Sequence, residues 1–333
     1  MMPTFPVQYS TLSATALKIH IENAYHLKLV SCKYLLRGVS DTYILEAADA
    51  RYIFKIYREQ HRSHGEILGE VELLNLLKER GASVAYPLRD IAGQTLQTFN
   101  APESIRYGIL FSYAEGEPVS DLNDTQLKTV GNQMAIVHNI AVTAELDYSR
   151  KPYTFETTLT RPLEILEPAF TELPAEYVYL KDISAKVIEK LSSFDLSGFS
   201  YGYCQYDFLP KNFHFTNDSK LTFFDFDFAG KGYLANDLMS FFVHFFMHTY
   251  TGKLTDEEAD RMYHVFISAY REVRPVSDQE IEAIPYLGVG FWVFYLGFQY
   301  ENFDDWSNLF FGQRFIKDRV ALIKAWVNKY CEF

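Results

Sequence analysis

CQYDFLPKNFHFTNDSKLTFFDFDFAGKG, residues 204–232, sets Asp207, Asn212, Asp225 and Asp227 among many phenylalanines. A carboxylate is costly to bury unless a positive group compensates its charge. The aromatic neighbours indicate a buried setting, and the simplest compensating partner is a metal ion. We therefore expect a cation-binding polar centre inside an aromatic core.

The spacing of these residues suits phosphate chemistry. Asn212 and Asp225 offer the hard oxygen atoms that Mg²⁺ prefers, and they stand at the two ends of a predicted hairpin whose closure brings them together. Asp207 then lies beside the metal, where a base could orient or accept a hydroxyl proton. Phosphoryl transfer needs a metal for the phosphates and a carboxylate for the nucleophile. A turn with unrelated surface acids is the alternative, but Asp-x-Asp at this distance after Asp-x₄-Asn is the more specific pattern.

Composition limits the possible functions. The chain has 333 residues, enough for one large or two moderate domains, and 48% of them are hydrophobic, enough for a sizeable core. The net charge of -12 argues against nucleic acid and against an anionic membrane surface as partners. The same charge permits a cationic small-molecule substrate.

Other features favour a cytoplasmic protein. Cys32, Cys204 and Cys331 are far apart and odd in number, as expected of reduced thiols rather than a disulfide framework. The N-terminal residues lack the basic and apolar regions of a signal peptide. The most apolar run, residues 284–298, is short and interrupted by Gly, so we predict a buried helix and not a membrane span.

The residue pattern of the chain changes near Gly116. Before it, alternating Val-, Ile- and Tyr-rich segments predict a small sheet, and residues 62–81 predict one long helix with a capping box from Ser63 to Glu66. After it, helical patterns recur. They are predicted at residues 124–141, 176–193, 233–250, 255–273, 279–298 and 306–330. We therefore predict an α+β fold with a sheet-rich N-lobe (1–115), a hinge near 112–118, and a larger, mainly helical C-lobe (116–333).

The opening stretch resembles a known family. YGYCQYDFLPKNFHF followed by LTFFDFDFAGKGYLANDL is similar to the catalytic segment of the aminoglycoside phosphotransferase and choline kinase group, which are small-molecule kinases with a protein-kinase-like fold. The family pattern is His-Gly-Asp, four residues, Asn, and then Asp-x-Asp. The resemblance implies that Asp207 is the catalytic residue. It implies that Asn212 and Asp225, with Asp227 nearby, hold the metal, and that Asp237 is a buried acid that braces the catalytic loop.

The match departs from the family at two positions. Gln205 and Tyr206 stand where the family usually has His and Gly. The family His is mostly a scaffold residue, so the Gln205 amide can replace its hydrogen bonds. Tyr206 adds bulk beside Asp207 and is a candidate contact for the substrate. His138, on the apolar face of a predicted helix, is expected to be a structural core histidine.

The N-lobe carries an independent signal. A kinase needs a strand Lys on the nucleotide phosphates and a helix acid that holds this Lys. Lys55 lies between Phe54 and Ile56 in a predicted strand. Glu70, fifteen residues later, shares the inward helix face and resembles the family's partner acid, with Glu66 as the rival.

Two further segments resemble nucleotide contacts of these kinases. Gly38 and Ser40 lie in a loop that resembles the phosphate-covering loop, although a simple hairpin turn explains Gly38 equally well. The backbone from Ser112 to Ala114 resembles the hinge that meets the adenine edge. The resemblance extends over residues ~30–250.

The C-terminal region combines acids with aromatic residues, a pairing that suits an amine by charge and by cation–π contact. The candidate substrate residues are Tyr300, Glu301, Asp304 and Trp306, together with Tyr206. An acidic helix end is the simpler explanation for each of them taken singly.

The main hypothesis is an ATP- and Mg²⁺-dependent phosphotransferase, acting as a monomer or homodimer on a hydroxyl of an aminoglycoside, amino alcohol or homoserine-like molecule. The sequence motifs resemble most closely those of the homoserine kinase and stress-response kinase branch. The alternative is a kinase-like nucleotide-binding or regulatory module with little turnover, suggested by Gln205 and Tyr206. A glycosyltransferase that uses Asp225 and Asp227 for a sugar nucleotide leaves Lys55 and Asn212 unexplained.

Lys55→Met provides the first test. If Lys55 contacts the nucleotide phosphates, the variant should bind or turn over Mg-ATP much more weakly while it stays folded, because the cation is lost and the hydrophobic stem is kept. Titration with Mg-ATP, beside a circular dichroism spectrum, measures this. Unchanged affinity and turnover would contradict the assignment of the N-lobe.

Overall fold

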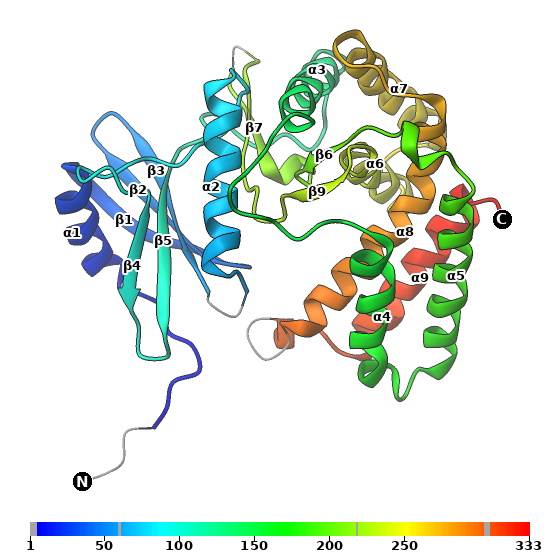
Figure 1. Ribbon diagram of the computed structural model, residues 1–333, viewed down its shortest axis with the longest axis horizontal. Helices are drawn as coiled ribbons and strands as arrows, with labels where there is room; N and C mark the ends of the chain where they lie inside the picture. Colours follow the sequence, from blue (N-terminus) through cyan, green and yellow to red (C-terminus); the bar gives the residue numbers. More distant parts are fainter. Residues whose placement is uncertain (1–4, 59–60, 218, 303–306) are drawn as a thin grey trace. The chain divides into compact units, whose positions relative to one another are not determined.

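The computed structural model describes residues 5–58, 61–217, 219–302 and 307–333. The chain forms two compact units. Unit 1 is Met1–Glu115 with Leu146–Ser149, and unit 2 is Gly116–Glu145 with Arg150–Phe333. The predicted α+β class is confirmed, with a sheet in unit 1 and mainly helices in unit 2 (Figure 1).

Unit 1 is built on an antiparallel sheet of five strands in the order β1-β2-β3-β5-β4. The register places Lys55 opposite Ile109 and Phe54 opposite Leu110. Lys55 is therefore held on an inner strand with paired neighbours on both sides. The strands are β1 (Leu29–Arg37), β2 (Asp41–Ala47), β3 (Arg51–Tyr57), β4 (Leu96–Asn100) and β5 (Ile105–Ser112).

Two helices complete unit 1. Helix α1 (Ala14–Tyr25) inserts Leu17 and Ile21 into a core that includes residues of β2, β3 and β5. Helix α2 (His64–Glu79) begins with the predicted capping box, in which Ser63 and Glu66 bind each other's backbone N–H groups.

Unit 2 is a helical assembly with two small β-ribbons (Figure 1). One ribbon joins β6 (Tyr201–Cys204) to β9 (Gly230–Tyr233), and the other joins β7 (Phe213–Phe215) to β8 (Leu221–Phe223). The long helices are α3 (Asp124–Ala141), α5 (Pro174–Ser192), α6 (Ala235–Tyr250), α7 (Asp256–Val273), α8 (Asp278–Glu301) and α9 (Gln313–Tyr330). The short ones are η1 (Glu156–Thr160), α4 (Arg161–Leu166), η2 (Glu167–Phe170), η3 (Leu196–Gly198), η4 (Pro210–Asn212) and η5 (Ser307–Leu309).

The predicted helices are present, with shifted boundaries. The last one begins at Gln313, seven residues later than predicted, and the short helices between 156 and 170 were not predicted. Helix α8 contains the apolar run 284–298. Among the described residues it is the one helix that is long and apolar enough to cross a membrane, and 67% of its most apolar window is buried inside the protein.

Gly116 occupies a position that other residues cannot adopt without strain. Its φ is +99°, and a Cβ there would lie 2.1 Å from the carbonyl oxygen of Phe215. This close approach lets the neighbouring Glu117 exchange backbone hydrogen bonds with Phe215 at 3.0 Å, which ties the start of unit 2 to β7.

Gly116→Ala should therefore destabilise unit 2 more than an ordinary left-handed glycine would. Gly252 is the matched control, because its φ is +71° and nothing lies within 4 Å of an added Cβ. We expect Gly252→Ala to cost about 1–2 kcal/mol for its backbone conformation alone. Gly116→Ala should cost a further ~1–3 kcal/mol because of the overlap with Phe215. Urea unfolding measures both, and equal losses would contradict the steric argument.

Candidate active site

The β7–β8 hairpin brings Asn212 and Asp225 to the same end of the ribbon. Phe213 pairs with Phe223, and the Phe224 N–H donates to the Asn212 carbonyl at 2.9 Å. Asn212 directly precedes β7 and Asp225 follows β8 by two residues. The closure that the sequence predicted therefore occurs.

Asp207 is held in one orientation. Its side chain is buried, and Oδ2 accepts from Asn212 Nδ2 at 2.9 Å and lies 2.8 Å from Lys211 Nζ. The other oxygen, Oδ1, is also buried and has no hydrogen-bond partner among the described residues. A buried carboxylate oxygen without a partner is costly, so Oδ1 is the atom at which a ligand group would be most strongly bound.

The local charges tune this carboxyl group. Burial raises the pKa of Asp207 above its ordinary value, Lys211 opposes this effect, and the nearby charge of Asp225 adds to it. Burial works to lower the pKa of Lys211, but the Asp207 and Asp225 charges outweigh it, so the pKa is raised and the lysine stays charged. Lys211 was missed in the sequence, although its place between Asp207 and Asn212 was a usable signal.

The residues fit a magnesium ion that also binds phosphate. The Asn212 side-chain nitrogen donates to Asp207, which leaves the side-chain oxygen as the atom that a metal would bind. Asp225 is exposed and Asp227 is buried beside it in sequence. Within the described ranges, no three His, Cys, Asp or Glu side chains form a ready metal cluster. Mg²⁺ is commonly held by one or two carboxylates plus substrate phosphates, which agrees with this donor set.

Asp237 binds the backbone of the loop that leads to Asp207. Its two oxygens accept from the Gln205 N–H at 2.9 Å and from the Tyr206 N–H at 2.6 Å. His138 Nε2 lies 3.0 Å from the same carboxylate, and its Nδ1 lies 2.8 Å from the Tyr270 hydroxyl. His138 is therefore a buried structural residue, as the sequence predicted.

Gln205 links the two halves of the site. Its side-chain amide donates to the carbonyls of Phe224 at 2.8 Å and Asp225 at 3.1 Å. A single side chain thus connects the loop of Asp207 to the loop of Asp225. The replacement of the family His leaves this connection intact.

Tyr206 shows why the family uses glycine here. Its φ is +67°, in the left-handed region that disfavours bulky residues. The ring is only 1% exposed and stacks on Tyr153, with centroids 3.6 Å apart and planes 5° apart. Phe291 and Phe294 of α8 pack around it. The aromatic packing offsets the backbone strain, which is of a kind that clusters at functional sites.

Tyr295 of α8 belongs to the same cluster and was not predicted. Its hydroxyl is buried and, like Asp207 Oδ1, makes no hydrogen bond of full geometry within the described part of the chain, although the two groups are close enough to interact. Burial raises the pKa of Tyr295 well above its usual value, and the neighbouring charge of Asp207 raises it further. The hydroxyl therefore keeps its proton and remains a donor close to the Asp207 carboxylate.

Arg150 and Tyr153 hold the loop that follows Asp225. Arg150 is buried and donates to the carbonyls of Ala229, at 2.7 Å, and of Asp227. The Tyr153 hydroxyl donates to the carbonyl of Phe228. These contacts join residues some 75 positions apart, so no local sequence pattern could have revealed them.

In unit 1 the predicted lysine and acid come together. Lys55 Nζ lies 4.0 Å from Glu70 Oε1, and the Tyr57 hydroxyl donates to Glu70 Oε2 at 3.1 Å. The rival Glu66 is used in the cap of α2. Both members of the Lys55–Glu70 pair are largely buried, which preserves their attraction.

The other predicted nucleotide contacts are placed as follows. The Gly38 N–H donates to the Ser40 carbonyl at 3.1 Å, and a Cβ on Gly38 would have its nearest neighbour at 3.6 Å, so the turn does not require glycine. The Ser112 N–H donates to Tyr86 at 2.9 Å and is thus already used. Ala114 is buried just after β5.

Two of the predicted substrate residues lie at the C-terminal end of α8. Tyr300 packs against Phe311 with ring centroids 5.6 Å apart, and Glu301 is the last residue of the helix. Asp304 and Trp306 lie outside the described residues.

Comparison with known proteins shows the family to which the chain belongs. Residues 31–276, more than half of the chain, match the group described as the phosphotransferase enzyme family. The chain belongs to this family. An uncharacterized protein of Synechocystis sp. is 32% identical over 82% of this phosphotransferase and 74% of its own length. A homoserine kinase of Methylobacterium sp. is 25% identical over 84% and 82%.

A solved structure shares the fold of this phosphotransferase. It is an amicoumacin kinase in complex with AMP-PNP, Ca²⁺ and Ami, with a TM-score of 0.76 and 19% identity. The similarity covers 96% of the phosphotransferase chain and 93% of the other. The resemblance to small-molecule kinases is thereby confirmed.

The role of Asp237 can be tested with an isosteric change. Asp237→Asn should destabilise the protein by about 1–3 kcal/mol. The NH₂ group of the new side chain would face a backbone N–H that now donates to a carboxylate oxygen, and that N–H would lose its acceptor. The Gln205 and Tyr206 amides should also exchange hydrogen faster. Asp182→Asn, at an exposed pair with Lys186 on α5, should change stability by less than ~0.5 kcal/mol. Equal effects of the two changes would contradict the bracing role.

Proposed function

We propose that the protein transfers the γ-phosphate of ATP to a hydroxyl group of a small molecule that carries an amine. The observation that carries this proposal is the state of Asp207. One of its oxygens is held by Asn212 and Lys211, and the other is buried without a partner among the described residues. A hydroxyl donor at Oδ1 would satisfy that oxygen and be aimed by it.

Each unit, taken by itself, carries residues suited to one part of a nucleotide. Lys55, positioned by Glu70, binds the phosphates, while the backbone around Gly38 and Ser40 covers them. The backbone from Ser112 to Ala114 meets the adenine edge. In unit 2, Asn212, Asp225 and Asp227 would hold Mg²⁺. When bound, the ion supplies positive charge that neutralises the phosphate oxygens.

The chain's own groups perform the remaining steps. Asp207 Oδ1 orients the acceptor hydroxyl and takes its proton as the new O–P bond forms and the bond between the γ-phosphorus and the β,γ-bridging oxygen breaks, so that ADP leaves. Lys211 favours the ionised form of this carboxyl group, because its charge opposes the rise in pKa that burial causes. Tyr295, a donor next to Asp207, positions the acceptor oxygen.

The acceptor side is placed on α8. This helix packs its aromatic residues around Tyr206 and ends in Tyr300 and Glu301. Aromatic faces and an acid favour an amine-bearing acceptor, in agreement with the net charge of -12. Relatives named for homoserine and amicoumacin support a small acceptor with a hydroxyl group. The three cysteines are free thiols, which supports a cytoplasmic location.

The alternative is a module that binds nucleotide with little turnover. Its basis is the Gln205–Tyr206 pair. Gln205 keeps the link to the Asp225 loop, and Tyr206 keeps the backbone bond to Asp237, so neither replacement removes a group that the transfer requires.

A screen for ADP release tests the proposal. The wild-type protein with Mg-ATP should turn over at least one of a panel of amino alcohols, homoserine and aminoglycosides well above its own ATP hydrolysis, and EDTA should abolish this. Asp207→Ala should lose turnover by about 10²–10⁴-fold while it keeps ATP affinity. Asp260→Ala, on the exposed surface of α7, is the control and should remain active. A panel that is silent while ATP binds would favour the module instead.

The pH profile tests the pairing of Asp207 with Lys211. Asp207 must be ionised to act as a base, so activity should fall on the acid side as pH drops through its pKa, which lies above the ordinary aspartate value. Lys211 lowers this pKa. Lys211→Met should therefore move the acid limb of kcat/KM to higher pH, and Lys211→Arg should restore it. An acid limb that stays in place would contradict the electrostatic role of Lys211.

A further inference from the structure

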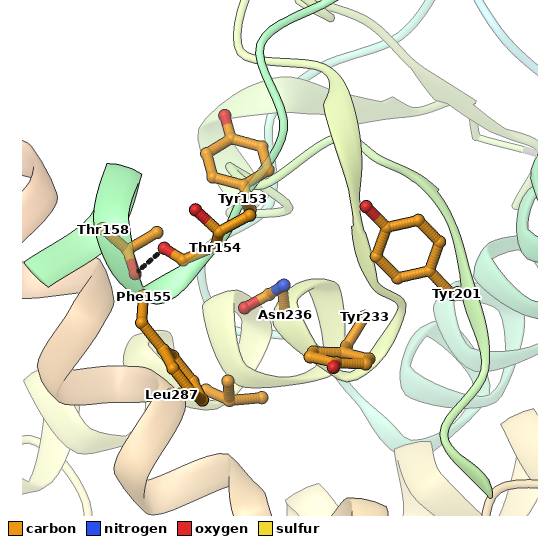
Figure 2. A pocket seen from close by; sticks show the side chains of 8 residues that line it. All are labelled: Tyr153, Thr154, Phe155, Thr158, Tyr201, Tyr233, Asn236 and Leu287. Atoms are coloured by element: carbon orange, nitrogen blue, oxygen red, sulfur yellow. Dashed lines mark hydrogen bonds between the residues drawn. The ribbon is translucent and has the colours of Figure 1, made fainter. Parts of the chain in front are cut away.

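A cavity of about 290 Å³ lies in unit 2, apart from the residues proposed for phosphoryl transfer (Figure 2). It opens beside the β6–β9 ribbon at the pair formed by Tyr201 and Tyr233. Asp207 follows the opposite end of β6, beyond Cys204. The cavity is lined by Tyr153, Thr154, Phe155, Thr158, Tyr201, Tyr233, Asn236 and Leu287.

The walls of the cavity are aromatic and uncharged. Tyr201 and Tyr233 meet edge to face, with centroids 5.7 Å apart and planes at 78°, and Tyr153 and Phe155 add two more rings. Among the described residues that line the cavity, none carries a charged side chain. A charged ligand would lose water here without gaining a partner, so the walls favour a neutral, flat molecule.

One polar group at the base of the cavity would fix the orientation of a bound ligand. Asn236 is only 4% exposed, and within the described residues its amide has no hydrogen-bond partner other than the Cys204 thiol. Figure 2 shows the amide at the centre of the floor, with its oxygen turned towards the side of Thr154 and Leu287. Thr158 does not compete for this oxygen, because its hydroxyl donates to the Thr154 carbonyl at 2.7 Å. A ligand N–H would fit the Asn236 oxygen.

Two of the lining residues are directly joined to the catalytic loop. Tyr153 stacks on Tyr206 and donates to the carbonyl of Phe228. Asn236 precedes Asp237, whose carboxylate holds the amides of Gln205 and Tyr206. A molecule that packs on Tyr153 and binds Asn236 therefore contacts the supports of the segment that carries Asp207.

We propose that this cavity is a binding site for a neutral planar aromatic amide, which stacks on the tyrosine rings and donates to Asn236, and that its occupancy stabilises the catalytic loop. The volume is at the small end of ligand pockets, about 300–1,000 Å³, so a single-ring molecule is the size that fits. This inference is independent of the proposed function, because it concerns binding and loop stability and needs no turnover.

Benzamide is the probe. Calorimetry on the full chain, with ADP present to fill the nucleotide site, should show a dissociation constant of about 1 mM or lower. Benzoate and benzamidinium have the same shape but carry a charge, and each should bind at least about tenfold more weakly because the cavity offers no counter-charge. Absence of benzamide binding up to about 10 mM, or equal binding of the three molecules, would overturn the proposal.

Substitutions locate the bound probe. Tyr201 is 44% exposed, so Tyr201→Ala should fold and should weaken benzamide binding by about tenfold through the lost ring contact. Leu287→Trp should block binding by filling the cavity. Tyr250 is a similarly exposed ring, at 50%, at the end of α6, and it does not line the cavity. Tyr250→Ala is therefore the matched control and should bind as the wild type does. Unchanged affinity in both cavity variants would overturn the proposed location.

Hydrogen exchange tests the link to the loop. Benzamide should slow exchange of the Gln205 and Tyr206 amides in the wild type and in Tyr250→Ala, and it should have no effect in Leu287→Trp. Binding without any change at these two amides would overturn the proposed coupling and leave only the binding site.

Discussion

The hydrogen bonds to the Asp237 carboxylate are the interaction on which the conformation of the Asp207 loop depends. This carboxylate is fully buried, and it accepts from two successive backbone amides, those of Gln205 and Tyr206, while His138 lies against it. Two adjacent amides can converge on one carboxylate only if the backbone turns sharply. The left-handed conformation of Tyr206 is that turn, and the next residue, Asp207, then meets Asn212 at the start of the β7–β8 hairpin.

The same turn explains the aromatic cluster. A glycine would adopt it without strain, whereas a tyrosine is disfavoured there unless its ring is well packed. Stacking on Tyr153 and contact with α8 supply that packing, and they bring Tyr295 close to Asp207. Tyr206, where the family usually has glycine, thus places a packed aromatic ring beside Asp207. Its stacking on Tyr153 connects this ring to the cavity that Tyr153 lines.

Charge and burial give neighbouring acidic residues different properties. Asp207 is shielded from water, which raises its pKa, and the charge of Lys211 opposes that rise. Asp225 remains exposed, where it can meet a metal bound to phosphate. In unit 1 the burial of Lys55 with Glu70 preserves a strong attraction between a cation and an acid that both come from regular elements.

The sequence by itself determined the features that depend on short-range spacing. The α+β organisation, the cap of α2, the inward-facing Lys55 and Glu70, and the hairpin joining Asn212 to Asp225 all follow from periodicity and turn chemistry within a few tens of residues. Only the tertiary structure decided the rest. The stacking of Tyr153 on Tyr206, the clamp of Arg150 on the Asp227 loop, the approach of Tyr295 to Asp207 and the cavity beside Asn236 join segments distant in the chain. Such contacts depend on how whole helices and strands pack against one another. The spacing of residues along the sequence does not predict that packing.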